Sequence, residues 1–512
     1  MYFIKGFAFL ATILSIGFFA WRSLVDPKLH RWTDLRFAVA IPLAAVGYLA
    51  PNIWVYYASV TGAMIFLPRS RIEAACFFIV ISLMLPLVSF EVRAGSMLLM
   101  QMTTVHAAAL GLIAAFRFPS YPSRIRVASS RYDALAFAMT AILFIIDCRS
   151  ADTSFTTAIR FAMAHGMTFF LPYYFLTRSP LTEQDPRRLV HCIAMIGFML
   201  AIVAIFESVK HWPLYQIMDR NLDIAGRSKS MNVRAGFLRS PGPFFESTTF
   251  GVFLAVATTM VIASRSLFRS KQAYWTSAAI CVIGTGATMA RNAWLGLIIG
   301  MVLITLYRGR SERFFALTLG GLLGMAVLSL VASNSTQVGE LVGSEGHAAA
   351  TADYRKDLFR NSIPLILEKP LIGWSYTDVR AYMRPIMSSS TLSVDYVNSY
   401  LFFAVVSGFI GLLIFLMYSL YSPWRIYLLR PKIKGFLWEY EVAAALFASG
   451  GAFIIMVGFT SYYERMPLFG VLLISLSRQL ELWSKNRLEL GRPNRAAVVS
   501  TAHEEFVEGM AG

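Results

Sequence analysis

Arginine is the residue type best suited to do chemistry in this sequence, because it recurs in polar segments that separate long apolar runs. Arg239 opens the segment RSPGPFFESTTFG, Arg291 lies in ATMARNAWLG, and Arg355 lies in TADYRKDLFRNSIP. A guanidinium group can bind two oxygens of a phosphate through parallel hydrogen bonds. The sequence therefore predicts an anionic ligand where these segments meet. Two more arginines would be supporting cations: Arg234 and Arg360.

Each of these arginines also has a structural interpretation. Arg291 is predicted at the depth of the membrane interface, where an ionisable group is costly unless it is paired or wet. It could instead extend to the lipid headgroups. Residues 353–368 have the pattern of an amphipathic helix that Pro370 stops and Gly373 turns, and its basic residues could contact lipid phosphates. Long external loops also cross a membrane whatever their charge.

Polar residues also stand where two apolar runs begin. Asp395 and Asn398 lie in SVDYVNSYLFF, and Asp395 could serve only as a helix N-cap. Glu246 directly precedes the apolar run 247–263. Glu246 could pair with Arg239, or it could be an acid at the first turn of a helix.

The composition indicates a membrane protein. The chain has 512 residues, of which 57% are hydrophobic and 15% are charged, whereas soluble domains contain about 25% charged residues. Apolar runs near the ~20 residues that span a bilayer recur from end to end. The first, FAFLATILSIGFFAW, is followed by polar residues rather than by a small-residue cleavage site, so we interpret it as a retained span. We predict an all-α, polytopic transmembrane helical bundle.

The net charge of +17 is better explained by topology than by nucleic acid. The basic residues stand mostly at the ends of apolar runs, which is typical of cytoplasmic loops. The sequence contains no nucleic-acid-binding motif, so we expect no nucleic-acid partner. The four cysteines have no paired spacing, which argues against a disulfide or zinc framework. We expect neither a metal nor a cofactor.

Placing the short basic loops on the cytoplasmic side gives a consistent topology with a cytoplasmic C-terminus. About 14 helices result, within a range of roughly 12 to 15, because the run 37–67 could be one span or two broken at Pro51. The basic loops are residues 22–36, 68–73, 117–133, 178–188, 264–272, 307–313 and 422–435. The predicted spans are 3–21, 37–67, 74–92, 96–116, 134–150, 157–177, 190–208, 247–263, 273–290, 293–307, 314–332, 398–421, 441–460 and 464–479.

Four motifs in order resemble a known family. Arg-x-x-Gly-Pro-Phe precedes one span, and Ala-Arg-Asn-Ala-Trp-Leu-Gly separates two others. Glu-Lys-Pro-Leu-Ile-Gly-Trp lies in the large external loop, and Asp-x-x-Asn-x-Tyr-Leu followed by Gly-x-x-Gly opens the next span. This order resembles the superfamily of O-antigen ligases and Wzy-type polysaccharide polymerases over about residues 190–420.

The resemblance implies an integral glycosyltransferase of the bacterial inner membrane that acts at the periplasmic face. The donor glycan would be carried on a polyprenyl diphosphate, and an acceptor hydroxyl would displace that diphosphate without a metal or a nucleotide sugar. Arg291 and Arg355 take the places of the family's diphosphate-binding arginines, and Arg239 belongs to the Arg/Gly loop lining the same cavity. The partners implied are the lipid-linked oligosaccharide, the bilayer, and other polysaccharide export or chain-length proteins.

The same resemblance divides the chain into four regions. A ligase/polymerase-like catalytic core would include the external loop 333–397. Transmembrane helices would flank this core, and a polar cytoplasmic tail would follow. The regions are 1–189 for the N-terminal helices, 190–421 for the core, 422–484 for the C-terminal helices and 485–512 for the tail.

The sequence departs from the family where the span after the large loop begins. Ligases of the family carry His-Asn there, and that histidine is a proposed base, whereas this chain has Val397 and Asn398. Because valine cannot accept a proton, Asp395 is the nearest replacement, Glu246 the second and His347 the third. The departure favours the polymerase or exopolysaccharide branch over a ligase.

Two other functions stay open. A ligase would transfer the glycan to lipid A core or to protein. A transporter or flippase of lipid-linked oligosaccharide would also use cations in a membrane cavity. A transporter predicts charges near the midplane and broken helices in two related halves, and this sequence has no visible repeat.

Overall fold

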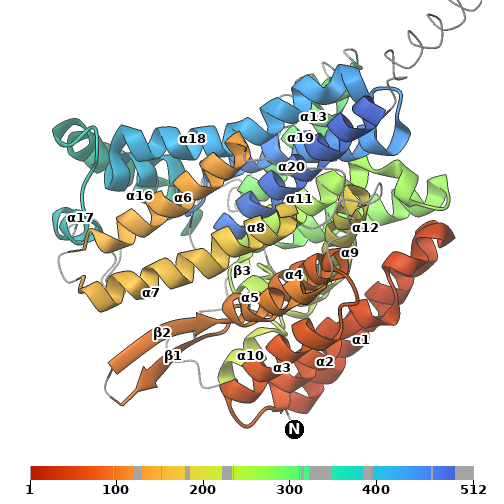
Figure 1. The fold of residues 1–512 in the computed structure, drawn as a ribbon, viewed down its shortest axis with the longest axis horizontal. Helices are drawn as coiled ribbons and strands as arrows, with labels where there is room; N and C mark the ends of the chain where they lie inside the picture. Colours follow the sequence, from red (N-terminus) through yellow and green to blue (C-terminus); the bar gives the residue numbers. More distant parts are fainter. Residues whose placement is uncertain are drawn as a thin grey trace, which may run out of the picture.

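The computed structural model is mostly helical, with the helices packed into one bundle (Figure 1). It describes residues 2–95, 97–118, 130–150, 153–178, 185–221, 233–234, 236–310, 312, 316, 318–321, 324, 347–383, 394, 396–462 and 465–490. The helices in chain order are α1 (Tyr2–Leu24), α2 (Ala40–Leu49), α3 (Ile53–Phe66), α4 (Arg71–Met84), α5 (Thr104–Ala114), α6 (Arg131–Cys148), α7 (Phe155–His165), α8 (Leu171–Arg178), α9 (Asp185–Lys210), α10 (Gln216–Asn221), α11 (Ser247–Ala263), α12 (Lys271–Ala287), α13 (Arg291–Tyr307), α16 (His347–Glu368), α17 (Tyr376–Tyr382), α18 (Ser399–Ile433), α19 (Leu437–Val457) and α20 (Met466–Leu490).

Two short antiparallel hairpins interrupt the helices and correct the all-α prediction. Strand β1 (Ser89–Ala94) pairs with β2 (Met97–Thr103), and β3 (Val233–Arg234) pairs with β4 (Phe237–Leu238). The first hairpin projects from the left of the bundle in Figure 1, on the side where α16 and α17 also lie. The fold is therefore a helical bundle with small β additions.

Within the described residues, four helices are long and apolar enough to cross a membrane: α1, α9, α18 and α19. Shorter apolar helices, including α11 and α13, accompany them. Large apolar side chains such as Phe19 of α1 and Leu413 of α18 are exposed, as expected for surfaces that contact lipid rather than water. These features are those of a multi-pass membrane protein.

The spans predicted at 74–92 and 96–116 are wrong. Helix α4 ends before Pro86, and the chain forms the β1–β2 hairpin before α5 begins. Glu91 and Arg93 make an exposed ion pair of 2.6 Å on β1. Proline interrupts helical hydrogen bonding, and a charged pair favours water, so this apolar stretch does not continue as two membrane helices.

The run 37–67 forms two helices, which decides between the two alternatives for it. Helix α2 ends before Pro51, and Asn52 caps α3 by accepting a hydrogen bond from the Val55 N–H at 3.1 Å. The predicted spans 247–263, 273–290 and 293–307 correspond closely to α11, α12 and α13. Most of the predicted span 314–332 lies outside the described residues, as does the tail after Leu490.

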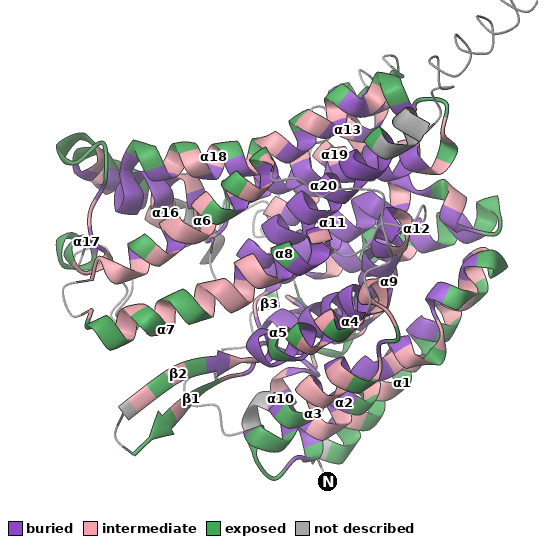
Figure 2. Cartoon of the chain, in the orientation of Figure 1, coloured by how far each residue is buried: buried purple, intermediate pink, exposed green. Residues whose placement is uncertain are grey.

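The centre of the bundle is formed by α4, α9 and α11, which are almost entirely buried (Figure 2). Helix α7 is exposed or half-buried along its length and lies at the outside of the bundle. Helices α13 and α19 pack against α11 and against each other. The segments that carry Arg239 and Arg291 therefore lead into helices α11 and α13, which pack at the centre of the bundle.

Several of the basic loops gather at one end of the bundle, which we call the basic-loop face. A bridge joins Val25 to Phe268, and the Arg187 guanidinium donates to the Ser266 carbonyl at 2.8 Å. The Ser266 N–H in turn donates to the Glu441 carboxylate at 2.9 Å. These contacts hold the segments that follow α1 and α11, and the beginnings of α9 and α19, on one side of the bundle, as the predicted topology requires.

Helix α18 is broken at Gly408, which has a φ of +63° and a ψ of −167°. Residues 370–374 of the large loop fit into the break, where the Phe409 N–H donates to the Pro370 carbonyl at 2.7 Å. A Cβ atom at Gly408 would lie 2.4 Å from the backbone of this segment. Irregular backbone within a membrane protein requires protein partners for its polar groups, and residues 370–374 supply them.

Arg149 completes this junction from the end of α6. Its guanidinium donates to the Val406 carbonyl at 3.0 Å and to the Gly373 carbonyl at 2.8 Å. The Trp374 N–H donates to the Val405 carbonyl at 2.8 Å. The helix predicted over 353–368 is confirmed, because α16 ends at Glu368 and Gly373 turns the chain with a φ of +64°.

Candidate functional site

The Arg239 loop is attached to the turn between α12 and α13. The Ser240 N–H donates to the Ala287 carbonyl at 3.4 Å, and the Arg234 guanidinium donates to the Met289 carbonyl at 3.0 Å. Residues 233–234, 236–246 and 288–291 thus meet at the end of the bundle opposite the basic-loop face. We call this end the site face.

Buried Glu207, at the end of α9, holds the loop in place. Its carboxylate accepts hydrogen bonds from the Ser240 hydroxyl at 2.6 Å, the Gly242 N–H at 3.0 Å and the Leu214 N–H at 2.9 Å. A carboxylate with this number of donors can be buried without a cationic partner. Sequence reasoning missed Glu207 because an acid that ends an apolar run resembles a simple helix terminus.

The Pro-Gly-Pro backbone packs against the aromatic core. Gly242 has a φ of +49°, and a Cβ atom there would lie 2.6 Å from the Phe250 ring. The Phe244 ring stacks on Phe250 with the centroids 5.5 Å apart. The Arg465 guanidinium lies 4.7 Å from the Phe244 centroid and donates to the Leu85 carbonyl. The Arg239 loop is therefore held against the interior of the bundle by the Phe250 ring and the Arg465 guanidinium.

Arg465 is a second residue that sequence reasoning missed. Its side chain is only 2% exposed, and it lies at the start of the predicted span 464–479. A single arginine at the end of an apolar run resembles a residue that extends to the lipid headgroups, so the sequence gives no signal that it folds inward. Burial beneath Phe244 makes Arg465 a positioning residue for the loop rather than a residue of the open surface.

Arg239, Arg291 and Glu246 are close enough to influence one another electrostatically. Burial lowers the pKa of the Arg239 guanidinium, the Glu246 carboxylate raises that pKa, and the Arg291 charge lowers it. The Arg239 Nη2 atom lies 3.5 Å from the Thr248 hydroxyl, and the Thr249 hydroxyl donates to Glu246 at 2.5 Å. The interpretation of Glu246 as a neighbour of Arg239 is thereby supported.

Two helices begin at this cluster. Glu246 precedes α11, and Arg291 is the first residue of α13. The N-terminus of a helix presents unbonded N–H groups and a partial positive charge, which favours anions. Two helix N-termini and the guanidinium groups of Arg239 and Arg291 therefore all contribute positive potential here, which favours an anion.

Buried donors around the cluster are not satisfied by the described part of the chain. They have no hydrogen-bond partner there: Arg239 Nε, Asn292 Nδ2 and Trp294 Nε1. Buried donors are nearly always paired, so the Arg239 Nε atom has capacity for an acceptor oxygen of a ligand.

Arg355 lies near this end of the bundle but on a different element. It is half-buried on α16, and its Nη2 atom lies 3.4 Å from the Phe459 carbonyl, just after α19. Because α19 packs along α13, this carbonyl is at the same end of the bundle as Arg291. Arg360 is exposed on α16. The structure therefore brings Arg234, Arg239 and Arg291 together and places Arg355 at the same end of the bundle.

Asn398 has a clear structural role as the N-cap of α18. Its side-chain oxygen accepts hydrogen bonds from the N–H groups of Tyr400 at 3.0 Å and Leu401 at 3.1 Å. Asp395 lies outside the described residues, between the buried residues Val394 and Tyr396. His347 is the first residue of α16, and its side chain is also outside the described part.

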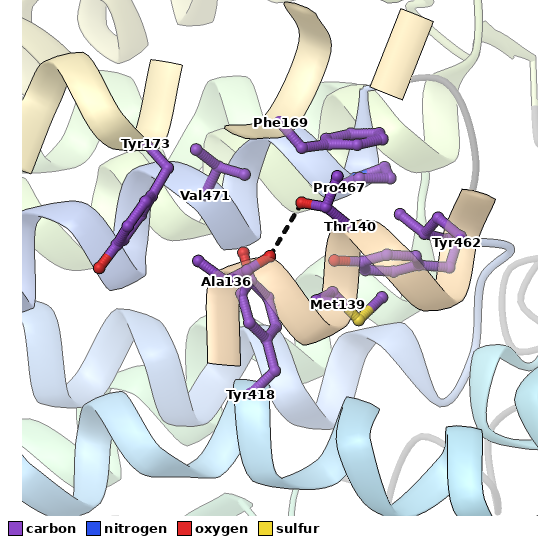
Figure 3. Close-up of a pocket in the computed structure, with 10 residues that line it drawn as sticks. Ala136, Met139, Thr140, Phe169, Tyr173, Tyr418, Tyr462, Pro467 and Val471 are labelled. Atoms are coloured by element: carbon purple, nitrogen blue, oxygen red, sulfur yellow. Dashed lines mark hydrogen bonds between the residues drawn. The ribbon is translucent and has the colours of Figure 1, made fainter. Parts of the chain in front are cut away.

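The chemistry that this arrangement can support is the binding of a polyanion. Within the described residues, no group of three or more His, Cys, Asp or Glu side chains could hold a metal ion. The narrow pocket in Figure 3, between α6, α8, α18 and α20, is lined mainly by apolar and aromatic side chains and lies elsewhere in the bundle. The arginine cluster is therefore the candidate site.

Comparison with protein families matches a region of the chain that includes part of the arginine cluster. Residues 276–416 match the family described as O-antigen ligase (Wzy_C), and members of this family are glycan-transferring membrane enzymes of the ligase/polymerase type. The match contains Arg291, Arg355 and Asn398, whereas Arg239 and Glu246 precede it. No curated protein matches the chain.

Proposed function

We propose, from the O-antigen ligase family domain at residues 276–416, that this chain polymerises oligosaccharide repeat units carried on polyprenyl diphosphate. The reaction is a metal-independent, inverting glycosyl transfer at the periplasmic face of the bacterial inner membrane. The product is an exopolysaccharide or O-antigen polymer. The site face would be periplasmic and the basic-loop face cytoplasmic.

The observation that carries this proposal is the cluster of Arg239 and Arg291 at two helix N-termini. A diphosphate leaving group needs its charge bound and stabilised, and fixed guanidinium groups do this without a metal. The buried Nε of Arg239, which lacks a partner among the described residues, adds a donor of the kind that a phosphate oxygen accepts. Arg355 would reach the same diphosphate from α16, supported by Arg234 and Arg360.

The reaction requires one bond to form as another breaks. The acceptor hydroxyl oxygen bonds to the anomeric carbon, and the bond from that carbon to the diphosphate oxygen breaks with its electron pair on the diphosphate. Single displacement inverts the anomeric configuration. The hydroxyl proton passes to a carboxylate, for which we propose Asp395, with Glu246 as the second choice. General-base assistance of this kind contributes roughly 100- to 10,000-fold.

A ligase reaction is the second candidate, because the matched family is described as O-antigen ligase. A deletion strain separates the two reactions. Single repeat units that accumulate on lipid indicate a polymerase, whereas long lipid-linked polymer that never reaches its acceptor indicates a ligase. Repeat units trapped on the cytoplasmic leaflet would instead indicate transport.

Alanine substitutions test the arginine assignment. Arg291→Ala and Arg355→Ala should each abolish polymer while the protein still inserts into the membrane, because loss of one charge-stabilising donor costs roughly 100- to 1000-fold. Arg269→Ala, an exposed arginine of the basic-loop face, is the matched control and should leave polymer unchanged. Normal chain lengths in both site variants would reject the assignment.

The base is tested by comparing two conservative changes. Asp395→Asn should reduce activity more than Glu246→Gln, with both proteins present at wild-type amounts. The opposite order would transfer the role of base to Glu246.

A further inference from the structure

Helix α18 carries a stripe of exposed apolar side chains that ends at Gly408. The stripe extends for about 29 Å along the helix axis, and the hydrocarbon core of a bilayer is about 30 Å thick. Arg430 and Lys432 follow it in the last turn of α18, at the basic-loop face. The stripe is therefore the lipid-facing side of this span, and its boundary toward the site face lies at Gly408. Its members are Phe409, Ile410, Leu413, Met417, Leu420, Trp424 and Leu428.

The part of α18 before this boundary, residues 399–408, is buried or half-buried throughout. It begins at the site face, where the Ser399 hydroxyl donates to the Thr460 carbonyl at 2.6 Å, just after α19. The large loop packs along it, because the Trp374 N–H donates to the Val405 carbonyl at 2.8 Å and α16 packs against α18 (Figure 1). The large loop therefore covers α18 between the boundary and the site face.

The loop that covers α18 is itself apolar on an outward side. On α16, Leu358 and Leu365 are buried against the bundle. Three large apolar side chains on another side of α16 are exposed at intervals of four residues, a spacing that places them on one face of a helix. Two more, in the segment after α16, are 64% and 62% exposed. We call this surface the outer stripe, and its members are Phe359, Ile363, Leu367, Leu371 and Ile372.

The outer stripe meets the lipid-facing stripe of α18 at the break in that helix. The Phe409 N–H donates to the Pro370 carbonyl at 2.7 Å, and the Ile410 N–H donates to the Leu371 carbonyl at 3.3 Å. The side chains of Phe409, Ile410 and Leu371 are all exposed. The lipid-facing surface of α18 is therefore joined directly to the outer stripe, and extended apolar surfaces of this kind mark contacts with a membrane or a partner.

The charged side chains near the outer stripe are arranged as at a membrane interface. Lys356 is exposed on the same side of α16 as the stripe, and the Lys369 Nζ atom lies 3.7 Å from the centroid of the Trp374 ring. Lysine and tryptophan are typical of the depth of the lipid headgroups. Asp357 and Glu368 are exposed but lie about 120° or more around the helix from the middle of the stripe. Helix α16 thus has an apolar side edged by a cation and an acidic side suited to water.

We propose that the outer stripe lies in the bilayer interface at the site face, with its apolar side chains against acyl chains and Lys356 at headgroup depth. Amphipathic helices bury their apolar face by about 5–10 Å in a membrane in this way. The occupant is lipid rather than a second copy of the chain, because the stripe is continuous with the lipid-facing side of α18. This location does not depend on the reaction that the protein catalyses.

The location of the outer stripe also has a consequence for Arg355, which lies on α16 four residues before Phe359. A helix held in the interface keeps this guanidinium near headgroup depth, where the diphosphate of a lipid-linked donor lies. This consequence rests on the proposed function. The polar double variant I363Q/L367Q should therefore lower polymer formation roughly tenfold, whereas the apolar double variant I363L/L367M should not.

The location is tested with nitroxide labels on the full chain in vesicles of phosphatidylethanolamine and phosphatidylglycerol. Cys148→Ala removes the half-buried thiol, and the other three cysteines are buried. In that background, Leu367→Cys and Leu371→Cys carry the label in turn, Leu413→Cys is the lipid-facing reference and Asp357→Cys is the water-facing control on the same helix. Dissolved oxygen enters hydrocarbon, whereas a water-soluble nickel chelate does not. The ratio of oxygen to nickel collisions at Leu367 and Leu371 should be roughly threefold or more above that at Asp357 and approach that at Leu413.

Two results would overturn the proposal. A collision ratio at Leu367 and Leu371 as low as that at Asp357 would place the outer stripe in water. Exclusion of both reagents would show that protein, such as a second copy of the chain, covers it. If the labelled variants do not fold, an apolar diazirine dissolved in the vesicles should react with residues 361–380 of the wild-type chain, and absence of that reaction would also overturn the proposal. These measurements require no activity, so they stand whether or not the chain is a polymerase.

Discussion

Two groups of cations lie at opposite ends of the bundle, and each lies beside a carboxylate. At the basic-loop face, Arg425 and Lys485 bind Glu481 directly. At the site face, Glu246 accepts a hydrogen bond from the Thr249 hydroxyl, and the buried Nε of Arg239 has no partner within the described residues. Two cations of the protein bind Glu481 directly, whereas Arg239 at the site face keeps one donor that no described residue uses.

This difference distinguishes charged side chains that stabilise the fold from charged side chains that can bind a ligand. A cation that is fully used by a carboxylate contributes to stability. A cation held in position by backbone carbonyls, as Arg234 is by the Met289 carbonyl, can instead bind a ligand. Removing a cation should therefore affect stability at the basic-loop face and activity at the site face.

The largest difference is expected between Arg239→Ala and Arg425→Ala. Arg239→Ala should lower polymer formation by roughly 100- to 1000-fold with an unchanged thermal midpoint. Arg425→Ala should reduce stability by on the order of 2 kcal/mol, because Glu481 is 4% exposed and keeps only part of its partners. A polymerisation assay and thermal unfolding of both purified variants make the comparison. A large loss of activity in Arg425→Ala at full stability would remove the distinction.

Substitution of Glu481 should mainly reduce stability and substitution of Glu246 should mainly reduce activity, with smaller effects than those of the arginine variants. Glu481→Gln leaves Arg425 and Lys485 without a counter-charge, so we expect a loss of about 1–3 kcal/mol in the free energy of unfolding. Glu246→Gln should leave stability almost unchanged and reduce activity by about tenfold. Thermal unfolding in detergent and the transfer assay measure both effects. Equal destabilisation by the two changes would show that Glu246 is also a structural ion-pair partner.

The smallest expected effects come from single hydroxyl groups. The Tyr132 hydroxyl donates to Glu481 at 3.0 Å, and Tyr132→Phe should cost about 1 kcal/mol of stability. Thr249→Val removes the donor to Glu246 and should lower the transfer rate a few-fold without a change in the thermal midpoint. A stability loss in Thr249→Val equal to that of Tyr132→Phe would weaken the contrast between the two ends.

Local sequence features predicted those parts of the fold that depend on nearby residues. The apolar run 247–263 is α11 with the same bounds, and Pro370 follows the end of α16 as a helix-stopping residue should. The hairpin β1–β2 was missed because its residues are apolar enough to pass for membrane helices. Hydropathy alone does not distinguish a strand pair from a span, so Pro86 and the Glu91–Arg93 pair were the better signals.

Within the site, the arginines were predictable and the residues that position them were not. Arg239 and Arg291 stand out because a charge near an apolar run is costly. Glu207 acts on the Arg239 loop from 33 and 35 residues away. Arg465 acts on the same loop from another part of the chain. Such contacts arise from tertiary packing, which spacing within a single segment does not encode.

The insertion of residues 370–374 into α18 has a consequence for how the chain is made. Because these residues precede α18, they are available when the broken helix leaves the ribosome, and synthesis proceeds from the N-terminus. Arg149, which lies 224 residues before its partner Gly373, is present earlier still. The break at Gly408 can therefore close around residues 370–374 before α19 and α20 are translated.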